Sequence, residues 1–232
     1  MTSWTPFVGY DEESEEFGMQ VNVMVGGPRD LIPVDWVRQH RDETWIGVDH
    51  GATLLLEWGI TPVAAIGDFD STNPAELARL QAALDDIEVY PPAKDFTDTQ
   101  LGIMTAIKKY QPDKIVVWGA TGGRLDQELA NLYLPLQDAF SDYLAKIELV
   151  DRGNVVRYFR PGTYSIHRRP DFDYLAFVNL TPVTGLTLPD EKYPLVNWHS
   201  PIPFAWSSNR FTSAVNHFSF DEGVVAVIWS RD

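Results

Sequence analysis

The sequence contains no cysteine, and its histidines are few: five in 232 residues, at positions 40, 50, 167, 199 and 217. Without cysteine the chain can form neither a disulfide nor a cysteine-ligated zinc site, and it has no thiol nucleophile. None of the histidines has the spacing of metal ligands. His50 lies in a polar loop, and we interpret it as a structural residue. Carboxylates are therefore the main candidate metal ligands.

Positive charge is scarce as well. Lysine and arginine number 18 against 33 aspartates and glutamates, which gives a formal net charge of −15. Such a chain repels nucleic acid and anionic membranes, so we expect neither as a partner. No apolar run approaches the length of a membrane span and no basic-then-apolar leader opens the chain, which predicts a soluble cytoplasmic protein. Anionic substrates are not excluded, because a divalent metal can invert the local charge.

The pattern of apolar residues divides the chain into three parts. Residues 1–18 carry an acidic cluster without apolar periodicity, and we interpret them as an N-terminal extension. In residues 19–152, short apolar runs alternate with helical segments. In residues 153–232, alternating or β-branched runs are separated by turn residues. We therefore predict an N-terminal domain over 19–152 and a C-terminal domain over 153–232.

The first domain has the pattern of an α/β protein. Strands are predicted over 21–25, 45–48, 63–66, 87–90, 115–118 and 147–150. Helices are predicted over 35–40, 52–58, 74–84, 97–110 and 125–139. Strands that are apolar on both faces and alternate with helices predict a mostly parallel sheet covered by helices, an α/β sandwich.

The second domain has no stretch with a helical period. Strands are predicted over 155–159, 163–167, 174–179, 184–188, 210–218 and 224–229. Short strands with frequent turn residues predict an antiparallel β-sandwich. The polar run 206–210 could present hydrogen-bonding groups to a ligand, but we interpret it as a turn.

Four polar motifs accompany the strands of the first domain. Three follow strands directly, at residues 47–51 (GVDHG), 67–71 (GDFDS) and 119–124 (GATGGR), and a fourth, 94–98 (KDFTD), opens a helix. The carboxyl ends of parallel strands lie at one edge of the sheet, where open α/β sheets bind ligands. We therefore expect the four motifs to converge on one site.

Three of these motifs carry the carboxylates of a candidate metal site. Asp68 and Asp70 are one residue apart after a predicted strand, and Asp49 and Asp98 occupy corresponding positions in other motifs. Carboxylates held close together favour a hard cation, and Mg²⁺ combines a few carboxylates with water and phosphate oxygens. For an isolated Asp-x-Asp pair the alternative is a solvated turn in which Asp68 caps the next helix. The matching positions of Asp49 and Asp98 favour the metal site.

The glycine-rich turn at 119–124 has the composition of an anion site. Backbone N–H groups at a helix N-terminus bind phosphate, and Arg124 adds a bidentate donor. The segment lacks the Gly-Lys-Ser/Thr sequence of a P-loop and the spacing of a dinucleotide fingerprint. Lys94 either neutralises phosphate charge or pairs with Asp95 at the surface. Asp126 either favours the helix dipole or points into the cleft.

Taken in order, these motifs resemble those of the thiamine pyrophosphokinase family. The resemblance rests on Asp49-x-Gly51, on 67–71, on 94–98 and on 122–126 with Asn131; it continues through 192–195 (KYPL), Ser208-Asn209 and 230–232 (SRD). It covers about residues 20–232, nearly everything except the extension. One departure is Gln127, where many bacterial members have histidine. A changed contact is expected there, with activity retained.

The resemblance implies transfer of the terminal diphosphate of ATP to the hydroxyl of thiamine, giving thiamine diphosphate and AMP. It implies Mg²⁺, a nucleotide- and metal-binding α/β domain, a thiamine-binding β domain, and a homodimer with sites composed from both subunits. The implied catalytic residues are Asp68, Asp70, Asp98 and Arg124, the three aspartates also holding metal. Implied nucleotide or phosphate contacts are Asp49, Gly51, Lys94, Thr121, Gly122, Gly123, Arg124 and Asp126. Implied substrate contacts are Gln127, Asn131, Tyr193, Ser208 and Asn209.

Two other functions fit the same motifs. A metal-dependent nucleotide pyrophosphatase would use the same carboxylates and transfer the diphosphate to water. A non-catalytic sensor of nucleotide or thiamine would be expected to lack a metal carboxylate, yet Asp68, Asp70 and Asp98 are all present. The sequence therefore favours an enzyme.

Overall fold

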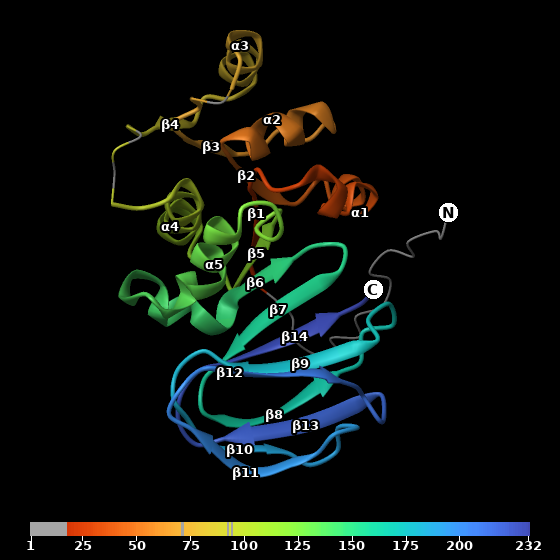
Figure 1. Cartoon of the computed structure of the whole chain (residues 1–232). Helices are drawn as coiled ribbons and strands as arrows, with labels where there is room; N and C mark the ends of the chain where they lie inside the picture. Colours follow the sequence, from red (N-terminus) through yellow and green to blue (C-terminus); the bar gives the residue numbers. More distant parts are fainter. Residues whose placement is uncertain (1–17, 71, 92, 94) are drawn as a thin grey trace. The chain divides into compact units, whose positions relative to one another are not determined.

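The computed structural model describes residues 18–70, 72–91, 93 and 95–232. The predicted extension, apart from Gly18, and the candidate Lys94 therefore lie outside the described residues. The chain separates into two compact units, the first formed by 1–140 with 149–152 and the second by 141–148 with 153–232 (Figure 1). Residues of β6 (Ile147–Val150) belong to both units.

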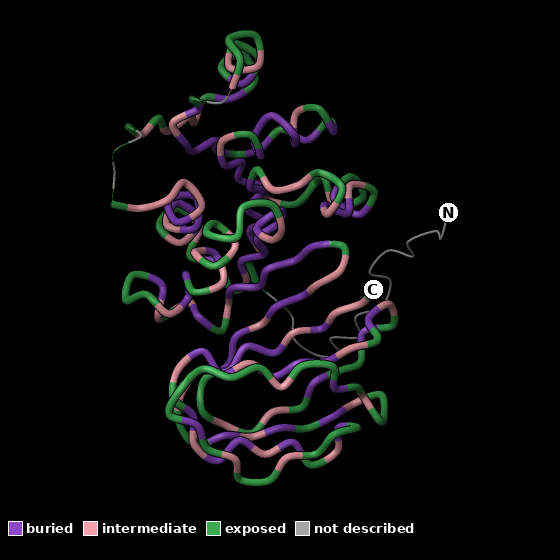
Figure 2. The backbone as a smooth tube through the Cα atoms, in the orientation of Figure 1, coloured by how far each residue is buried: buried purple, intermediate pink, exposed green. Residues whose placement is uncertain are grey.

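Unit 1 contains a parallel sheet with the strand order β5-β1-β2-β3-β4. Its strands are β1 (Gln20–Met24), β2 (Thr44–Val48), β3 (Ala64–Gly67), β4 (Ile87–Val89) and β5 (Lys114–Trp118). Its helices are α1 (Val34–Gln39), α2 (His50–Glu57), α3 (Pro74–Ala83), α4 (Asp98–Tyr110) and α5 (Leu125–Tyr133). Short 3-10 helices occupy Arg29–Leu31, Leu134–Leu136 and Asp138–Lys146. The central strands are buried on both faces (Figure 2), as their continuous apolar sequence predicts.

Helices cover both faces of this sheet. Successive strand residues face opposite sides, so Gly47 and Val48 show which helix lies on which face. A side chain at Gly47 would meet Ala52 of α2, whereas a side chain at Gly102 of α4 would meet Val48. The predicted α/β layers are therefore confirmed.

Two helices of unit 1 begin at side-chain caps. At α3, Asn73 accepts the N–H groups of Ala75 and Glu76, and Pro74 occupies the first turn. At α4, Thr97 and Gln100 form a capping box. Side chains satisfy backbone donors that have no partner within the helix, and this fixes where each helix starts.

Unit 2 is an antiparallel β-sandwich, as predicted. One sheet has the order β12-β9-β14-β7 and the other β11-β10-β13-β8. The strands are β7 (Asn154–Phe159), β8 (Gly162–His167), β9 (Tyr174–Asn179), β10 (Val183–Leu188), β11 (Leu195–Ser200), β12 (Phe204–Asn209), β13 (Val215–Phe220) and β14 (Val225–Ser230). Phe218 of the second sheet packs edge-on against Phe159 and Phe177 of the first, so aromatic side chains fill the space between the sheets.

Three predicted elements need correction. The predicted helix 125–139 ends at Tyr133, because Pro135 cannot continue an α-helix and a 3-10 turn follows. The predicted strand 210–218 starts only at Val215. β11 was not predicted at all, because only one of its six residues is buried and its sequence therefore has no apolar period. The run 206–210, interpreted as a turn, continues β12 to Asn209, with a register irregularity after Trp206.

Candidate functional site

A cavity of about 720 Å³ lies where several predicted motifs meet in unit 1. Its described lining comes from residues 25–28 after β1, 48–50 after β2, 95–99 at the start of α4, and the turn after β5, with Gln127 and Asn131 of α5. From β1 the strands β2, β3 and β4 follow one another on one side, and the chain then crosses back to place β5 on the other side of β1. Open α/β sheets bind ligands at such a switch point, so the cavity is the candidate site.

Asp49 joins the loop after β2 to the loop after β3. Its backbone N–H donates to the Ile66 carbonyl at 2.9 Å, and its Oδ1 accepts the N–H of Phe69 at 3.3 Å. Asp49 has a φ of 46°, an uncommon conformation for a residue other than glycine. Gly51 lies so close to β1 that a Cβ there would be 2.1 Å from the Met24 carbonyl oxygen. Both residues thus shape the site loop, and Asp49 also lines the cavity.

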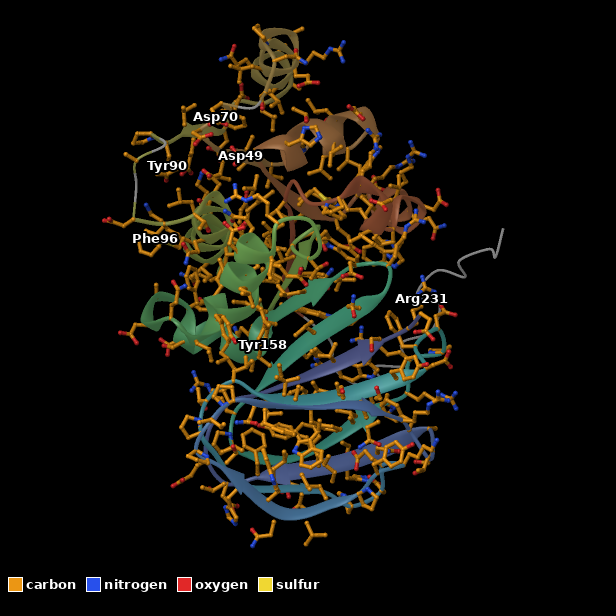
Figure 3. The ribbon with its side chains drawn as sticks, in the orientation of Figure 1. Asp49, Asp70, Tyr90, Phe96, Tyr158 and Arg231 are labelled. Atoms are coloured by element: carbon orange, nitrogen blue, oxygen red, sulfur yellow. The ribbon has the colours of Figure 1, made fainter. Side chains whose placement is uncertain are left out.

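Asp68 and Asp70 lie in the loop that follows β3, where Figure 3 labels Asp70 above Asp49. Asp68 is half-buried and its Oδ1 accepts the Asp70 N–H at 3.1 Å, while Asp70 is exposed. Asp68 does not cap the next helix, because Asn73 does. The local bond and the φ of 53° at Phe69 turn the loop sharply.

The structure does not gather the predicted metal carboxylates into one cluster. Asp98, the first residue of α4, lines the cavity, but Asp68 and Asp70 are outside its described lining. Among the described residues, no three histidine, aspartate or glutamate side chains form a group able to hold a metal ion. The donors are nonetheless carboxylate oxygens, the chemistry that Mg²⁺ prefers.

The glycine-rich turn closes another side of the cavity. Gly122 and Gly123 have φ values of 74° and 76°, which glycine adopts without strain. Arg124 lines the cavity and forms a two-pronged pair with Asp126: Nε to Oδ1 at 3.1 Å and Nη2 to Oδ2 at 2.6 Å. These hydrogen bonds raise the pKa of Arg124 and lower the pKa of Asp126. Asp126 therefore contacts the glycine-rich turn through Arg124.

Two predicted substrate residues project from α5 toward the same cavity. Gln127 is exposed on its lining. Asn131 is buried, and its Nδ2 donates to the carbonyl of Ala120 at 2.8 Å. Thr121, in contrast, is outside the described lining and donates its hydroxyl to Asp151. Asn131, in α5, and Asp151, directly after β6, thus hold the turn in place from two different elements.

The sequence interpretation missed part of the lining. Residues 26–28 (GGP) follow β1 directly, and their composition was a signal for a site loop. His50, expected to be structural, also lines the cavity, with Nδ1 3.0 Å from the Thr53 hydroxyl. The described lining carries the carboxylates of Asp49, Asp95 and Asp98. A polyphosphate bound here would need cations beyond Arg124.

The predicted thiamine contacts belong to unit 2. Tyr193 is exposed, Ser208 has a φ of 59° in β12, and Asn209 is buried. Asn209 Oδ1 accepts the Tyr193 N–H and its Nδ2 donates to the Tyr193 carbonyl, both at 2.9 Å. The amide of Asn209 is therefore engaged in holding the 190–193 segment.

One unexpected carboxylate lies beside this segment. Glu191 is 4% exposed, and neither of its carboxylate oxygens has a hydrogen-bond partner among the described residues. Burial raises its pKa from 4.5 to about 7. No sequence motif indicated this residue, because an acidic side chain after a predicted strand is ordinarily solvated.

No helix in the described part of the chain is long and apolar enough to cross a membrane.

Family models match two segments: 38–145 as "Thiamin pyrophosphokinase, catalytic domain" and 163–225 as "Thiamin pyrophosphokinase, vitamin B1 binding domain".

Individual proteins match over most of their length. The thiamine pyrophosphokinase of Bacillus subtilis is 38% identical over 216 residues, which are 91% of this chain and 99% of that protein. A Lactobacillus plantarum crystal structure is 46% identical with a TM-score of 0.84, covering 93% of this chain and 100% of the other. An Enterococcus faecalis protein of the thiamin pyrophosphokinase family is 37% identical with a TM-score of 0.85 and the same coverage. This chain belongs to the thiamin pyrophosphokinase family.

Proposed function

We propose that this chain transfers the terminal diphosphate of ATP to the hydroxyl group of thiamine, which gives thiamine diphosphate and AMP. The thiamine oxygen forms a bond to the β-phosphorus, the bond from that phosphorus to the oxygen bridging it to the α-phosphate breaks, and the hydroxyl proton is released. The observation that carries the proposal is the cavity at the switch point of the sheet, lined by the glycine turn, Arg124 and Asp98. Membership of the family supports the same reaction.

The glycine turn and Arg124 are proposed to bind the phosphates. Asp126 engages Nε and Nη2 of Arg124 and so fixes the plane of the guanidinium, while Nη1 lies outside that pair. A planar donor held in this way suits the tetrahedral oxygens of a diphosphate. Gly123 lines the cavity and has no side chain to block the approach of a phosphate to its backbone. Gly51, Asp49 and Thr121 shape the neighbouring loops, and Lys94 is proposed as a further phosphate contact.

Asp68, Asp70 and Asp98 are proposed to hold Mg²⁺. Their carboxylate oxygens are suitable donors. The acidic lining of the cavity would repel the phosphates of ATP, so ATP is expected to bind together with a cation. When bound, the ion would neutralise charge on the phosphate oxygens, which is the largest contribution to catalysis in reactions of this type. Asp68 and Asp70 share one loop, so they would act together. Asp98 lies on the cavity lining at the start of α4, in no three-carboxylate group with them among the described residues, and is proposed as a separate ligand.

Thiamine recognition is proposed for residues 153–232, and nucleotide and metal binding for residues 19–152. Tyr193, Ser208 and Asn209 supply aromatic and amide groups in the second domain, and Gln127 and Asn131 supply amides at the cavity. An aromatic face attracts the thiazolium cation, and the net charge of −15 favours its approach.

We also propose that the protein is a homodimer whose sites combine the sheet edge of one subunit with the β domain of the other. Exposed apolar side chains gather near the two edge strands β11 and β12. Val196 is 78% exposed, Ile202 64% and Phe204 45%. Side chains of this kind on sheet edges support contact with a second copy. A symmetric dimer would then contain two equivalent sites.

The reaction is tested by incubating the purified chain with ATP, Mg²⁺ and thiamine, and by measuring AMP and thiamine diphosphate. We expect both products in equal amounts, and neither when thiamine is omitted. AMP formed at the same rate without thiamine would identify a nucleotide pyrophosphatase instead. Binding of ATP or thiamine without any product would identify a sensor.

A further inference from the structure

The glycine turn is held from outside the cavity by three carboxylates. Its residues Gly122 and Arg124 line the cavity, whereas Asp126, Glu128 and Asp151 do not belong to the described lining. Each carboxylate nevertheless contacts the turn: Asp151 accepts from the Thr121 hydroxyl, Glu128 from the Gly122 N–H, and Asp126 from Arg124. The turn expected to bind an anion is therefore fixed by three carboxylates that lie outside the described cavity lining.

Glu128 reaches the backbone of the turn directly. Its Oε2 accepts the Gly122 N–H at 3.2 Å. Two successive residues in the left-handed region, Gly122 and Gly123, continue neither a strand nor a helix. Their conformation therefore depends on contacts with side chains. The Gly122 N–H, expected to bind phosphate, is instead engaged by Glu128.

We propose that Glu128 is a positioning residue for the nucleotide. Through the Gly122 N–H it holds the turn in the shape that presents Gly123 and Arg124 to the phosphates of ATP. Glu128 itself does not touch the nucleotide, because a carboxylate facing the phosphates would repel them. This inference rests on the proposed binding of ATP in the cavity.

A simpler role for Glu128 is stabilisation of α5, because acidic residues favour the first turn of a helix. Glu76 of α3 provides a matched comparison. It lies in the first turn of its own helix, and its Oε2 accepts the N–H of Asn73 at 3.3 Å, but α3 contributes nothing to the described cavity lining. Comparing the two glutamates separates stabilisation of a helix from positioning of the turn.

The experiment uses Glu128→Asp, Glu128→Gln and the control Glu76→Asp in the full chain. Aspartate keeps the negative charge but is one methylene shorter, so it loses the bond to Gly122. Glutamine keeps the length and an oxygen that accepts the same N–H. The Kd for ATP with Mg²⁺ is measured by calorimetry without thiamine, and the KM for each substrate and the Tm are measured in parallel.

We expect Glu128→Asp to weaken ATP binding by about fivefold, the effect of one hydrogen bond, with the KM for thiamine unchanged. Glu128→Gln keeps ATP binding close to wild type, and Glu76→Asp changes only the Tm. The inference is overturned if Glu128→Asp binds ATP normally, if Glu128→Gln is the weaker variant, or if Glu76→Asp weakens ATP binding equally. A wild-type chain that neither binds ATP nor transfers diphosphate would instead refute the proposed function on which the inference depends.

Discussion

Asn209 and the backbone of Tyr193 hold each other through two reciprocal hydrogen bonds of 2.9 Å, and Asn209 Oδ1 also accepts the N–H of Arg210. Asn209, which accepts and donates these bonds, is 3% exposed, whereas Tyr193 is 57% exposed. The buried amide therefore fixes the backbone that carries an exposed aromatic ring in the domain proposed to bind thiamine.

Asn209→Ala should lower the free energy of unfolding by about 2 kcal/mol, because several hydrogen bonds to a buried amide are lost. The KM for thiamine should rise more than the KM for ATP, because Tyr193 loses its support. Urea unfolding and steady-state kinetics measure the two effects. Ser207→Ala, at an exposed neighbour in β12, is the control and should change neither. Equal rises in both KM values would contradict this role.

Asp70→Asn should reduce kcat by roughly 100-fold or more, because the substitution removes a charge proposed to hold Mg²⁺. Asp70 is exposed, so the Tm should stay close to that of the wild type. Activity is measured over a range of Mg²⁺ concentrations. Near-normal turnover at saturating Mg²⁺, with an unchanged Mg²⁺ requirement, would show that Asp70 serves another purpose.

Arg124→Lys should reduce kcat by roughly tenfold or more, because lysine offers a point charge in place of a planar donor. The substitution also removes the two-pronged pair with Asp126, which no lysine can reproduce. The KM for thiamine should change little. A variant whose only defect is a raised KM for thiamine would mean that Arg124 does not bind the diphosphate.

Mixing two inactive variants tests the composite site. Asp70→Asn and Tyr193→Ala, each inactive alone, should recover about one quarter of wild-type activity after complete subunit exchange, because half of the dimers are mixed and each of those has one intact site. Exchange is verified with differently tagged subunits. If exchange is complete and no activity returns, each subunit builds its site alone.

Glu191 should make stability depend on pH. Its pKa is raised by burial from 4.5 to about 7, so the folded chain binds this proton more tightly than the unfolded chain. The stabilising effect is complete below about pH 4.5 and is lost as the pH rises to about 7, a decrease on the order of 3 kcal/mol.

Urea unfolding of the wild type and Glu191→Gln at pH 5 and pH 8 measures this effect. Glu191→Gln should remove most of the difference between the two pH values and should be the more stable protein at pH 8. Asp173→Asn, at an exposed position in the same unit, provides the control for a changed charge. An unaltered pH dependence in Glu191→Gln would show that another group titrates.

Local signals predicted much of the fold. The predicted helix 97–110 agrees within one residue with α4, which begins after the capping box of Thr97 and Gln100, and the predicted helix 74–84 starts at Pro74 as α3 does. The sequence did not reveal β11, because an edge strand with exposed side chains has no apolar period. It also overextended the last helix of unit 1, where the predicted periodicity ran past Pro135.

Three of the four motifs expected to converge do line the cavity, because parallel strands bring their carboxyl ends to one edge, whereas no residue of the motif 67–71 belongs to the described lining. Asp49, Asp98, Gly122, Gly123 and Arg124 all line the cavity as that rule predicts. The sequence could not distinguish residues that face the cavity from those that support it. Asp126, for example, bonds to Arg124 but is outside the described lining, and that distinction requires the direction of each side chain.

The sequence by itself determined the two-part architecture, the family and the chemistry of the candidate groups, because these depend on residue types and on periods of two and 3.6 residues along the chain. Only the tertiary structure decided which of these groups are hydrogen-bonded and which are buried. Glu128 reaches back to Gly122, Asp151 meets Thr121 from 30 residues away, and the buried carboxylate of Glu191 has no hydrogen-bond partner among the described residues. The physical reason is that hydrogen bonding and burial depend on distances between segments that no local pattern encodes.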